Sequence, residues 1–244
     1  MHAAAAPFDP ERLIPDLLSL PGGGTWWVAF SGGADSMALL HALVAVRHEL
    51  PATIRALHVD HCLHSDAGEW AEFCAETCSR WSIPLQVERI QVRADRGRGL
   101  EAEARRARYA AAASLLETGD VLLTAHHADD QAETVILNLM RGSGVDGLAG
   151  MPFQRALGNG QLARPLLPYP GSSLRQYLSR EGLEWIEDTS NRDLSYDRNF
   201  VRHELVTVLE KRWPGSWRNL SMSAGYCREA SDFVAASCRG LLDA

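Results

Sequence analysis

Short apolar runs alternate with longer segments of helical period between Thr25 and Arg141. Brief β-branched or apolar runs are typical of strands, and apolar positions three and four residues apart are typical of helices. The strands expected on this basis are Trp26–Phe30, Ile54–Val59, Leu85–Ile90 and Val121–Thr124. Because a helical pattern follows each run, the sequence predicts parallel strands joined by crossover helices.

The predicted fold is an open, twisted, parallel α/β sheet of the Rossmann-like kind with helices on both faces, followed by a helical segment. The first helices are expected at about Ser36–Arg47, Asp66–Trp81, Leu100–Leu116 and Asp130–Arg141. Residues 142–171 are rich in glycine and proline, which predicts loops. Helical patterning returns at Ser172–Glu181, Asn199–Trp213 and Ser216–Gly240.

Composition narrows the class of protein. The chain has 244 residues and a formal charge of -7, which argues against a protein that coats nucleic acid indiscriminately. A local excess of arginine between Arg89 and Arg108 leaves two interpretations open, a contact with RNA backbone or a solvated helix face. Five cysteines without a signal peptide, and no long apolar run, predict a reduced, cytoplasmic protein.

The first chemistry-bearing segment is Ser31-Gly32-Gly33-Ala34-Asp35-Ser36, which follows a predicted strand and opens a predicted helix. Backbone N–H groups in such a turn point into one concavity at the positive end of a helix dipole, where phosphate binds. It is not a Walker A loop, because the Gly-Lys-Ser/Thr ending is missing. The alternative is an ordinary glycine-rich turn between strand and helix.

The second segment, Ala125–Thr134, follows the fourth strand. If the strand order is 3-2-1-4, this segment and the glycine-rich loop face one crevice where the order reverses. Asp130 and Glu133 lie three residues apart, and together with Asp35 they could hold Mg²⁺. Asp-x-x-Glu at a helix start is also a capping-box pattern, so both interpretations remain open.

A third cluster, His58–His64, ends the second strand. Its spacing matches no closed structural zinc site. We expect His58 and Asp60 to contact a bound nucleoside, the alternative being a strand end that is merely hydrogen-bonded.

Several ordered motifs resemble one known family. The loop Ser31–Ser36 has the Ser-Gly-Gly-x-Asp-Ser form of the N-type ATP pyrophosphatases, the PP-loop superfamily. Within that superfamily the chain resembles the tRNA(Ile)-lysidine synthase family. The other segments that carry the resemblance are His58–His64, Leu100–Arg105 with Arg108-Tyr109, His126–Thr134, Arg141–Gly144 with Gly147-Leu148, Arg164–Leu167, Trp185–Asp188 with Ser190-Asn191, and Tyr196 with Arg198-Asn199 and Arg202.

The resemblance implies an ATP-dependent ligase. Such an enzyme adenylates the C2 oxygen of the wobble cytidine of isoleucine tRNA with a CAU anticodon and releases pyrophosphate. Free L-lysine then displaces AMP at C2 to give lysidine. By the same resemblance, Ser31, Gly32, Gly33, Ala34, Asp35 and Ser36 hold ATP. Asp35, Asp130 and Glu133 bind Mg²⁺ or position the reacting groups, and His126 lies by the phosphates. The residues implied to approach the tRNA or brace the site are Arg105, Arg108, Arg198, Asn199 and Arg202.

The expected organisation has three parts: a helical lead-in at 1–24, the catalytic domain at 25–213, and at 214–244 a helical linker or the start of a missing or truncated C-terminal domain. The last expectation follows from the resemblance, because family members usually continue into C-terminal tRNA-binding domains. Two alternatives remain, a tRNA 2-thiolating PP-loop enzyme and a non-catalytic ATP-binding module. The sequence leaves the oligomeric state open, with a homodimer among the candidates.

Overall fold

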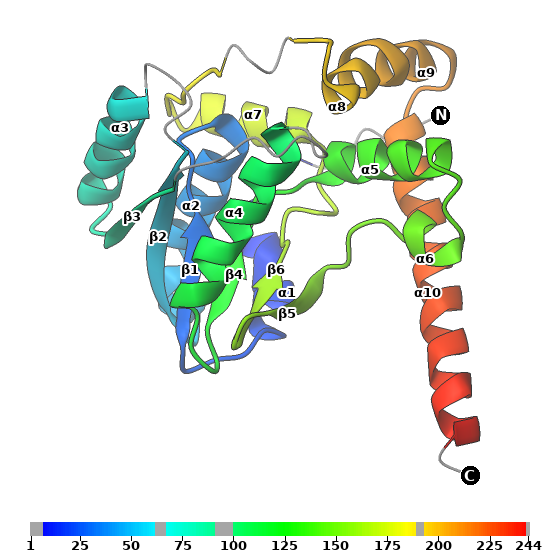
Figure 1. Cartoon of the computed structure of the whole chain (residues 1–244). Helices are drawn as coiled ribbons and strands as arrows, with labels where there is room; N and C mark the ends of the chain where they lie inside the picture. The colour runs from blue at the N-terminus through cyan, green and yellow to red at the C-terminus, as the bar shows by residue number, and fades with distance from the viewer. Residues whose placement is uncertain (1–6, 62–66, 91–99, 189–192, 243–244) are drawn as a thin grey trace.

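The computed structural model of this chain describes residues 7–61, 67–90, 100–188 and 193–242. Its centre is a six-stranded sheet in the order β3-β2-β1-β4-β6-β5 (Figure 1). Neighbouring strands pair in parallel except β5 and β6, which are antiparallel. The strands are β1 Thr25–Ala29, β2 Thr53–Asp60, β3 Leu85–Arg89, β4 Val121–Leu123, β5 Gln154–Leu157 and β6 Gly160–Ala163.

The prediction of the first four strands is confirmed, and their order is 3-2-1-4, the condition under which the two motifs were expected to face one crevice. After β1 the chain crosses to β2 on one side, while β4 lies on the other side of β1. The order therefore reverses between β1 and β4, which is where ligands bind on open sheets of this kind.

The expectation of loops throughout residues 142–171 is wrong. This stretch contains the short helix α6 Val145–Leu148 and the hairpin β5–β6. Each strand of the hairpin mixes polar with apolar residues, Gln-Arg-Ala-Leu and Gly-Gln-Leu-Ala, so neither forms an apolar run like that of β4. The two-residue turn at Gly158-Asn159 is the signal that could have revealed it, because Gly158 has φ +58°, a conformation that favours glycine.

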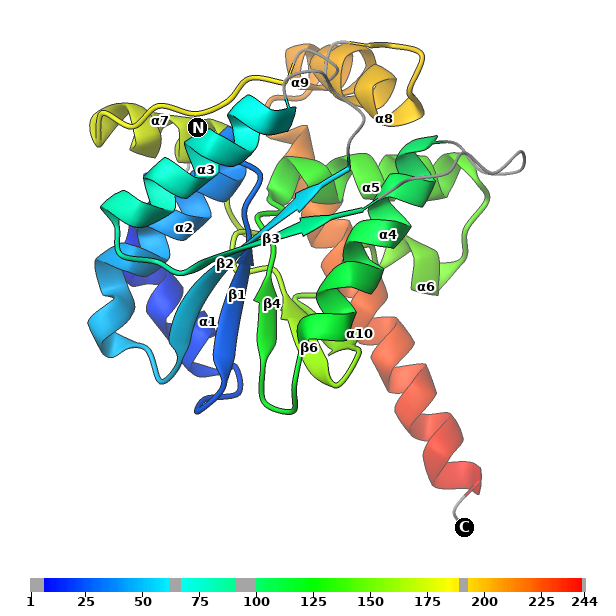
Figure 2. The same ribbon diagram turned by 60° about the vertical axis from the view of Figure 1, so that its left-hand side comes forward.

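Helices cover both faces of the sheet (Figures 1 and 2). α2 Ala34–Val46, α3 Ala67–Arg80 and α7 Gly171–Arg180 share one core, and α4 Leu100–Leu115 contributes to the other. The two adjacent tryptophans of β1 show the alternation of a strand, since Trp26 is buried in the first core and Trp27 in the second.

The N-terminal residues are helical, with a 3-10 helix at Pro10–Leu13 followed by α1 Ile14–Leu18. Leu13 and Leu17 are fully buried in the core that also holds α2, so this lead-in packs into the main body. At the other end, α10 Ser216–Leu242 runs beside α5 Ala128–Met140 and α6, and its distal end extends away from the sheet in both views (Figures 1 and 2). Among the described helices, none combines the length and apolar character that a bilayer crossing requires.

The single helix predicted at Asn199–Trp213 is instead three consecutive helical pieces. These are α8 Asp197–Phe200, a π-helical turn Val201–Leu205 and α9 Val206–Arg212. Apolar spacing does not reveal the extra residue of a π turn, so the pattern predicted one continuous helix. Such turns are frequent at functional sites, and this one begins between two arginines that contact α5.

Candidate functional site

The glycine-rich loop joins β1 to α2, as predicted, and hydrogen bonds between its own residues fix its conformation. Gly32 has φ +81°, and Gly33 is the N-cap of α2. The Ser36 hydroxyl donates to the carbonyl of Gly33 at 2.9 Å and lies 3.2 Å from the hydroxyl of Ser31. The first-turn N–H groups of a helix have no intrahelical acceptor, so this end of α2 offers donors and a positive dipole to an anion.

Ile186, far along the chain, is hydrogen-bonded to this loop, and we call this contact the strap. The backbone N–H of Ile186 donates to the carbonyl of Gly32 at 2.9 Å, and Ile186 forms a parallel bridge with Gly33. A Cβ on Gly32 would lie 2.5 Å from Cδ1 of Ile186. The strap therefore requires glycine at 32. The sequence identified Trp185–Asp188 through the resemblance alone and missed this contact.

Just after β4, His126 is a partly buried, neutral histidine. Its Nδ1 lies 2.8 Å from the Thr124 hydroxyl. Burial lowers the pKa of His126 to about 3; nearby Asp130 opposes this shift, and Arg105, Arg164 and Arg198 add to it. A neutral imidazole can donate or accept a hydrogen bond at the crevice but carries no charge toward a phosphate.

His127 has the opposite character and was missed by the sequence reasoning. It is the N-cap of α5, and its Nε2 lies 3.4 Å from Oδ2 of Asp35 and 3.6 Å from Oδ2 of Asp130. Burial alone would lower the pKa of His127, but the carboxylates of Asp130, Asp35 and Asp129 outweigh it and raise the pKa to about 9. An imidazolium therefore joins the glycine-rich loop to α5.

A capping box is present, but it pairs Asp130 with His127 rather than with Glu133. The backbone N–H of His127 donates to Oδ2 of Asp130 at 3.0 Å. The N–H of Asp129 lies 3.2 Å from Nδ1 of His127, which accepts from it only in the neutral form of the ring. The box therefore closes between His127 and Asp130, and Glu133 takes no part in it.

Glu133 instead binds two arginines. Its side chain is only 1% exposed, and it accepts from Nε of Arg198 at 2.7 Å and from Nε of Arg202 at 2.6 Å. Both guanidinium groups also reach Oδ1 of Asp130, at 3.0 and 3.1 Å. This buried four-residue network ties α8 and the π-helical turn to α5, so Arg198 and Arg202 brace the site, one of the two roles expected for them.

The predicted magnesium set is brought together only in part. The described residues contain no group of three His, Cys, Asp or Glu side chains placed to hold one metal ion, because Glu133 faces the arginines. Asp35 and Asp130 do meet across His127, and Oδ1 of Asp35 is buried without a hydrogen-bond partner. Two carboxylates with a spare oxygen suit Mg²⁺, which takes few protein ligands and keeps water and phosphate oxygens.

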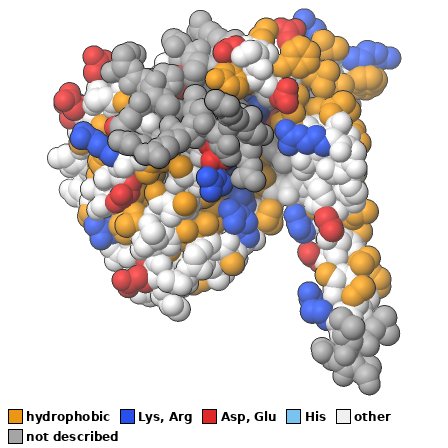
Figure 3. Space-filling model, viewed as in Figure 1, with side chains coloured by type: hydrophobic (Ala, Val, Ile, Leu, Met, Phe, Trp, Pro, Cys, Tyr) orange, Lys and Arg blue, Asp and Glu red, His pale blue; other side chains and the backbone are white. Residues whose placement is uncertain are grey.

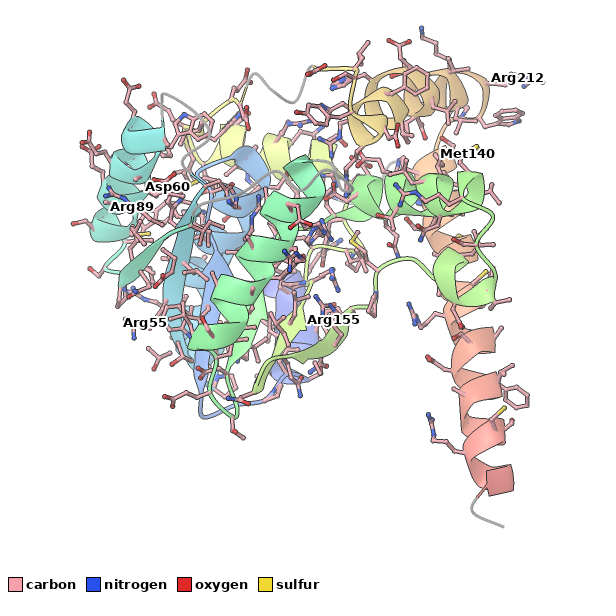
Figure 4. All side chains as sticks on the ribbon, viewed as in Figure 1. Arg55, Asp60, Arg89, Met140, Arg155 and Arg212 are labelled. Atoms are coloured by element: carbon pink, nitrogen blue, oxygen red, sulfur yellow. The ribbon has the colours of Figure 1, made fainter. Side chains whose placement is uncertain are left out.

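His58 and Asp60, which were expected to contact a bound nucleoside, contact other parts of the protein instead. His58 is buried, and its Nδ1 donates to the carbonyl of Phe30 at 2.9 Å, which matches the alternative of a hydrogen-bonded strand end. Asp60 is partly buried, and its Oδ2 lies 3.8 Å from Nε of Arg89 on the neighbouring strand (Figure 4). Cys62 and His64 lie outside the described residues.

The remaining predicted arginines and Asn199 are spread over the molecule. Arg108 contacts Nε2 of His61, with its Nη2 at 3.0 Å. Arg105 is exposed and stacks over the ring of Tyr109. Asn199 donates to the carbonyl of Asp193 at 2.9 Å, outside the Glu133 network. Arg93, Arg96, Arg98, Ser190 and Asn191 lie outside the described residues.

Cys74 and Cys78 lie one turn apart on α3 and are buried. Burial raises the pKa of each thiol to about 12. Both therefore stay protonated near neutral pH, which does not suit the nucleophilic thiolate that sulfur transfer requires.

Fold and loop together define a nucleotide-binding α/β domain of the PP-loop class. The family model described as "PP-loop domain" matches residues 11–209, and the chain belongs to this family. A solved structure, the U34-tRNA thiolase of Methanococcus maripaludis with its [4Fe-4S] cluster, superposes with a TM-score of 0.71 at 16% identity over 90% of this chain and 78% of that one. That likeness concerns the fold.

The sequence relatives are more specific. The chain is 49% identical to the tRNA(Ile)-lysidine synthase of Alkalilimnicola ehrlichii over 91% of its own length and 50% of the relative. It is 42% identical to that of Coxiella burnetii over 92% of its length and 50% of the relative. The chain thus spans about half the length of the curated relatives it matches.

Proposed function

We propose that this chain carries the catalytic part of a tRNA(Ile)-lysidine synthase. The observation that carries the proposal is the convergence of Asp35, His127 and Asp130 beside a PP-loop, in a chain 49% identical to an enzyme of that name. The reaction joins lysine to C2 of the wobble cytidine of isoleucine tRNA with a CAU anticodon. It consumes ATP, releases pyrophosphate and AMP, and makes a carbon–nitrogen bond. We expect it to take place in the cytoplasm.

The PP-loop residues 31–36 would bind the phosphates of ATP through backbone N–H groups and the dipole of α2. Asp35 and Asp130 would hold Mg²⁺, which when bound neutralises charge on the departing pyrophosphate. In the first step the C2 oxygen of cytidine attacks the α-phosphate and pyrophosphate leaves. In the second, the lysine side-chain amine attacks C2 and AMP leaves. An amide-like oxygen is a poor leaving group, and adenylation converts it into a good one.

The protein's contribution to this chemistry is mainly positioning and electrostatics. The His127 imidazolium holds Asp35 and Asp130 at the crevice, and the Glu133 network fixes the backbone of α5 behind them. His126, being neutral, can hydrogen-bond to substrate without repelling a cationic amine.

The test is ATP-dependent incorporation of labelled lysine into unmodified isoleucine tRNA, with Asp35→Asn as the matched inactive variant. The proposal predicts incorporation by the wild type and a loss of at least about 100-fold in the variant, comparable to removing one electrostatic contact to a transition state. A sensor that only binds ATP would release no pyrophosphate. A thiolating enzyme would leave lysine unincorporated and add sulfur instead.

A further inference from the structure

A cluster of arginines surrounds one tyrosine outside the crevice. Tyr109 lies on α4, and the guanidinium carbons of Arg105 and Arg155 lie 5.3 and 5.4 Å from the centre of its ring. Arg155 is on β5, in the hairpin that the sequence did not predict, and it is exposed. Arg164 follows β6, is only 3% exposed, and lies near enough to Tyr109 to interact with it electrostatically.

No carboxylate neutralises these three arginines among the residues that the structure describes. The side chains of Arg155 and Arg164 donate to backbone carbonyls, those of Ala156 at 3.1 Å and Pro152 at 2.6 Å, and Nε of Arg164 is buried without a partner. Burial lowers the pKa of Arg164, and the charges of Arg155 and Arg105 lower it further. Unbalanced positive charge on a protein of net charge -7 marks this surface as a place for an anion.

The location connects the cluster to the crevice. Arg105 and Arg164 both act electrostatically on His126, and Arg155 extends the cluster outward along the hairpin beside α4 (Figure 4). In the space-filling view, Lys and Arg side chains gather near the middle of this face (Figure 3). Exposed, planar guanidinium groups stacked on an aromatic ring suit the phosphodiester backbone of RNA, which they can contact through two parallel hydrogen bonds.

We propose that Arg105, Tyr109, Arg155 and Arg164 form an RNA-backbone docking surface, in which the β5–β6 hairpin receives phosphates of the tRNA next to the anticodon segment held in the crevice. This inference rests on the proposed function for the identity of the RNA. Arg105 was already expected to approach the tRNA; the structure adds Arg155 on the β5–β6 hairpin, which no motif indicated, as the outer residue of this face. Arg164 is buried and contributes its charge rather than a direct contact.

The test compares two charge reversals, Arg155→Glu and Arg175→Glu, in tRNA binding measured between 50 and 200 mM KCl. Arg175 is an exposed arginine on α7, on the opposite face of the sheet, and serves as the matched control. Arg155→Glu should weaken binding at least about tenfold and reduce the slope of log affinity against log salt by about one, as for the loss of a phosphate contact. Arg175→Glu should change neither, and both variants should bind ATP like the wild type.

Equal tRNA affinity and salt slope for the wild type and Arg155→Glu would overturn the inference. So would an equal loss in Arg175→Glu, because it would reveal a general effect of net charge. Arg155→Lys keeps the charge without the planar fork and should bind with intermediate affinity. A wild type that binds tRNA through Arg155 but incorporates no lysine would leave the docking surface standing and refute the proposed function.

Discussion

At the residue scale, the site depends on side chains whose roles are set by their neighbours. His126 and His127 are adjacent in sequence, yet one is neutral and the other carries a charge near neutral pH. The difference follows from position: burial lowers the pKa of His126, whose Nδ1 lies by the Thr124 hydroxyl, whereas His127 lies among three carboxylates. The sequence could not separate these two environments, because strand order alone does not fix where each side chain points.

The charge on His127 predicts a pH dependence of stability. Its folded pKa of about 9 lies above the ordinary value of 6.5, so its contribution is fully present below pH 6.5 and is lost as the pH rises through 9. Asparagine also caps helices but carries no charge. The difference in free energy of unfolding between wild type and His127→Asn, measured by urea denaturation, should therefore shrink by up to about 3 kcal/mol between pH 6.5 and 9.5. A constant difference would exclude the imidazolium bridge.

The two glycines of the loop provide a second prediction. Gly32→Ala places a methyl against Ile186 and forces φ +81° on alanine, so it should lower the free energy of unfolding by about 1–3 kcal/mol. At Gly33 a Cβ would meet only ordinary contacts at 3.5 Å or more. Because Gly33 is the N-cap of α2, where alanine is less favourable than glycine, Gly33→Ala should cost about 0.5–1 kcal/mol, less than Gly32→Ala. Thermal and urea unfolding check both, and equal losses would contradict the described strap.

At the element scale, apolar patterning predicted most helices and strands, because each shows a helical period or an apolar run, as even the three residues of β4 do. It failed for β5 and β6, whose few residues include polar ones, and for the π-helical turn at Val201–Leu205. The PP-loop and the acidic start of α5 were identified as parts of one crevice from strand order. The arginine network was not, because Arg198 and Arg202 are 65 or more residues away from Glu133 and nothing local pairs them.

That network predicts unequal effects of two similar substitutions. Glu133→Gln leaves the partly buried guanidinium groups of Arg198 and Arg202 with Asp130 as their one remaining carboxylate, and should lower the free energy of unfolding by about 2 kcal/mol. Glu181 pairs with Arg180 at the surface, and Glu181→Gln should lower it by less than about 1 kcal/mol. Urea denaturation at pH 7 compares the two. A small effect at Glu133 would mean that α8 and the π-helical turn are not fastened to α5 through this residue.

At the scale of the whole molecule, we propose that the crevice between β1 and β4 binds the nucleotide and that the hairpin beside it forms a second, cationic surface. α10 runs past α5 and away from the sheet, so the region expected at 214–244 begins as a helix in contact with the element that carries Asp130 (Figures 1 and 2). We interpret residues 25–213 as the catalytic domain. The helical lead-in completes its core rather than forming a separate unit.

The central claim, that this chain adenylates a tRNA base for attack by lysine, is tested most directly by trapping the intermediate. The chain is incubated with ATP labelled in its α-phosphate and unmodified isoleucine tRNA, without lysine, and the RNA is isolated. The account predicts label on the RNA, its release as AMP when lysine is added, and no label with Asp35→Asn. RNA that acquires no label from the folded, ATP-binding wild type, or labelled RNA that lysine does not discharge, would contradict it.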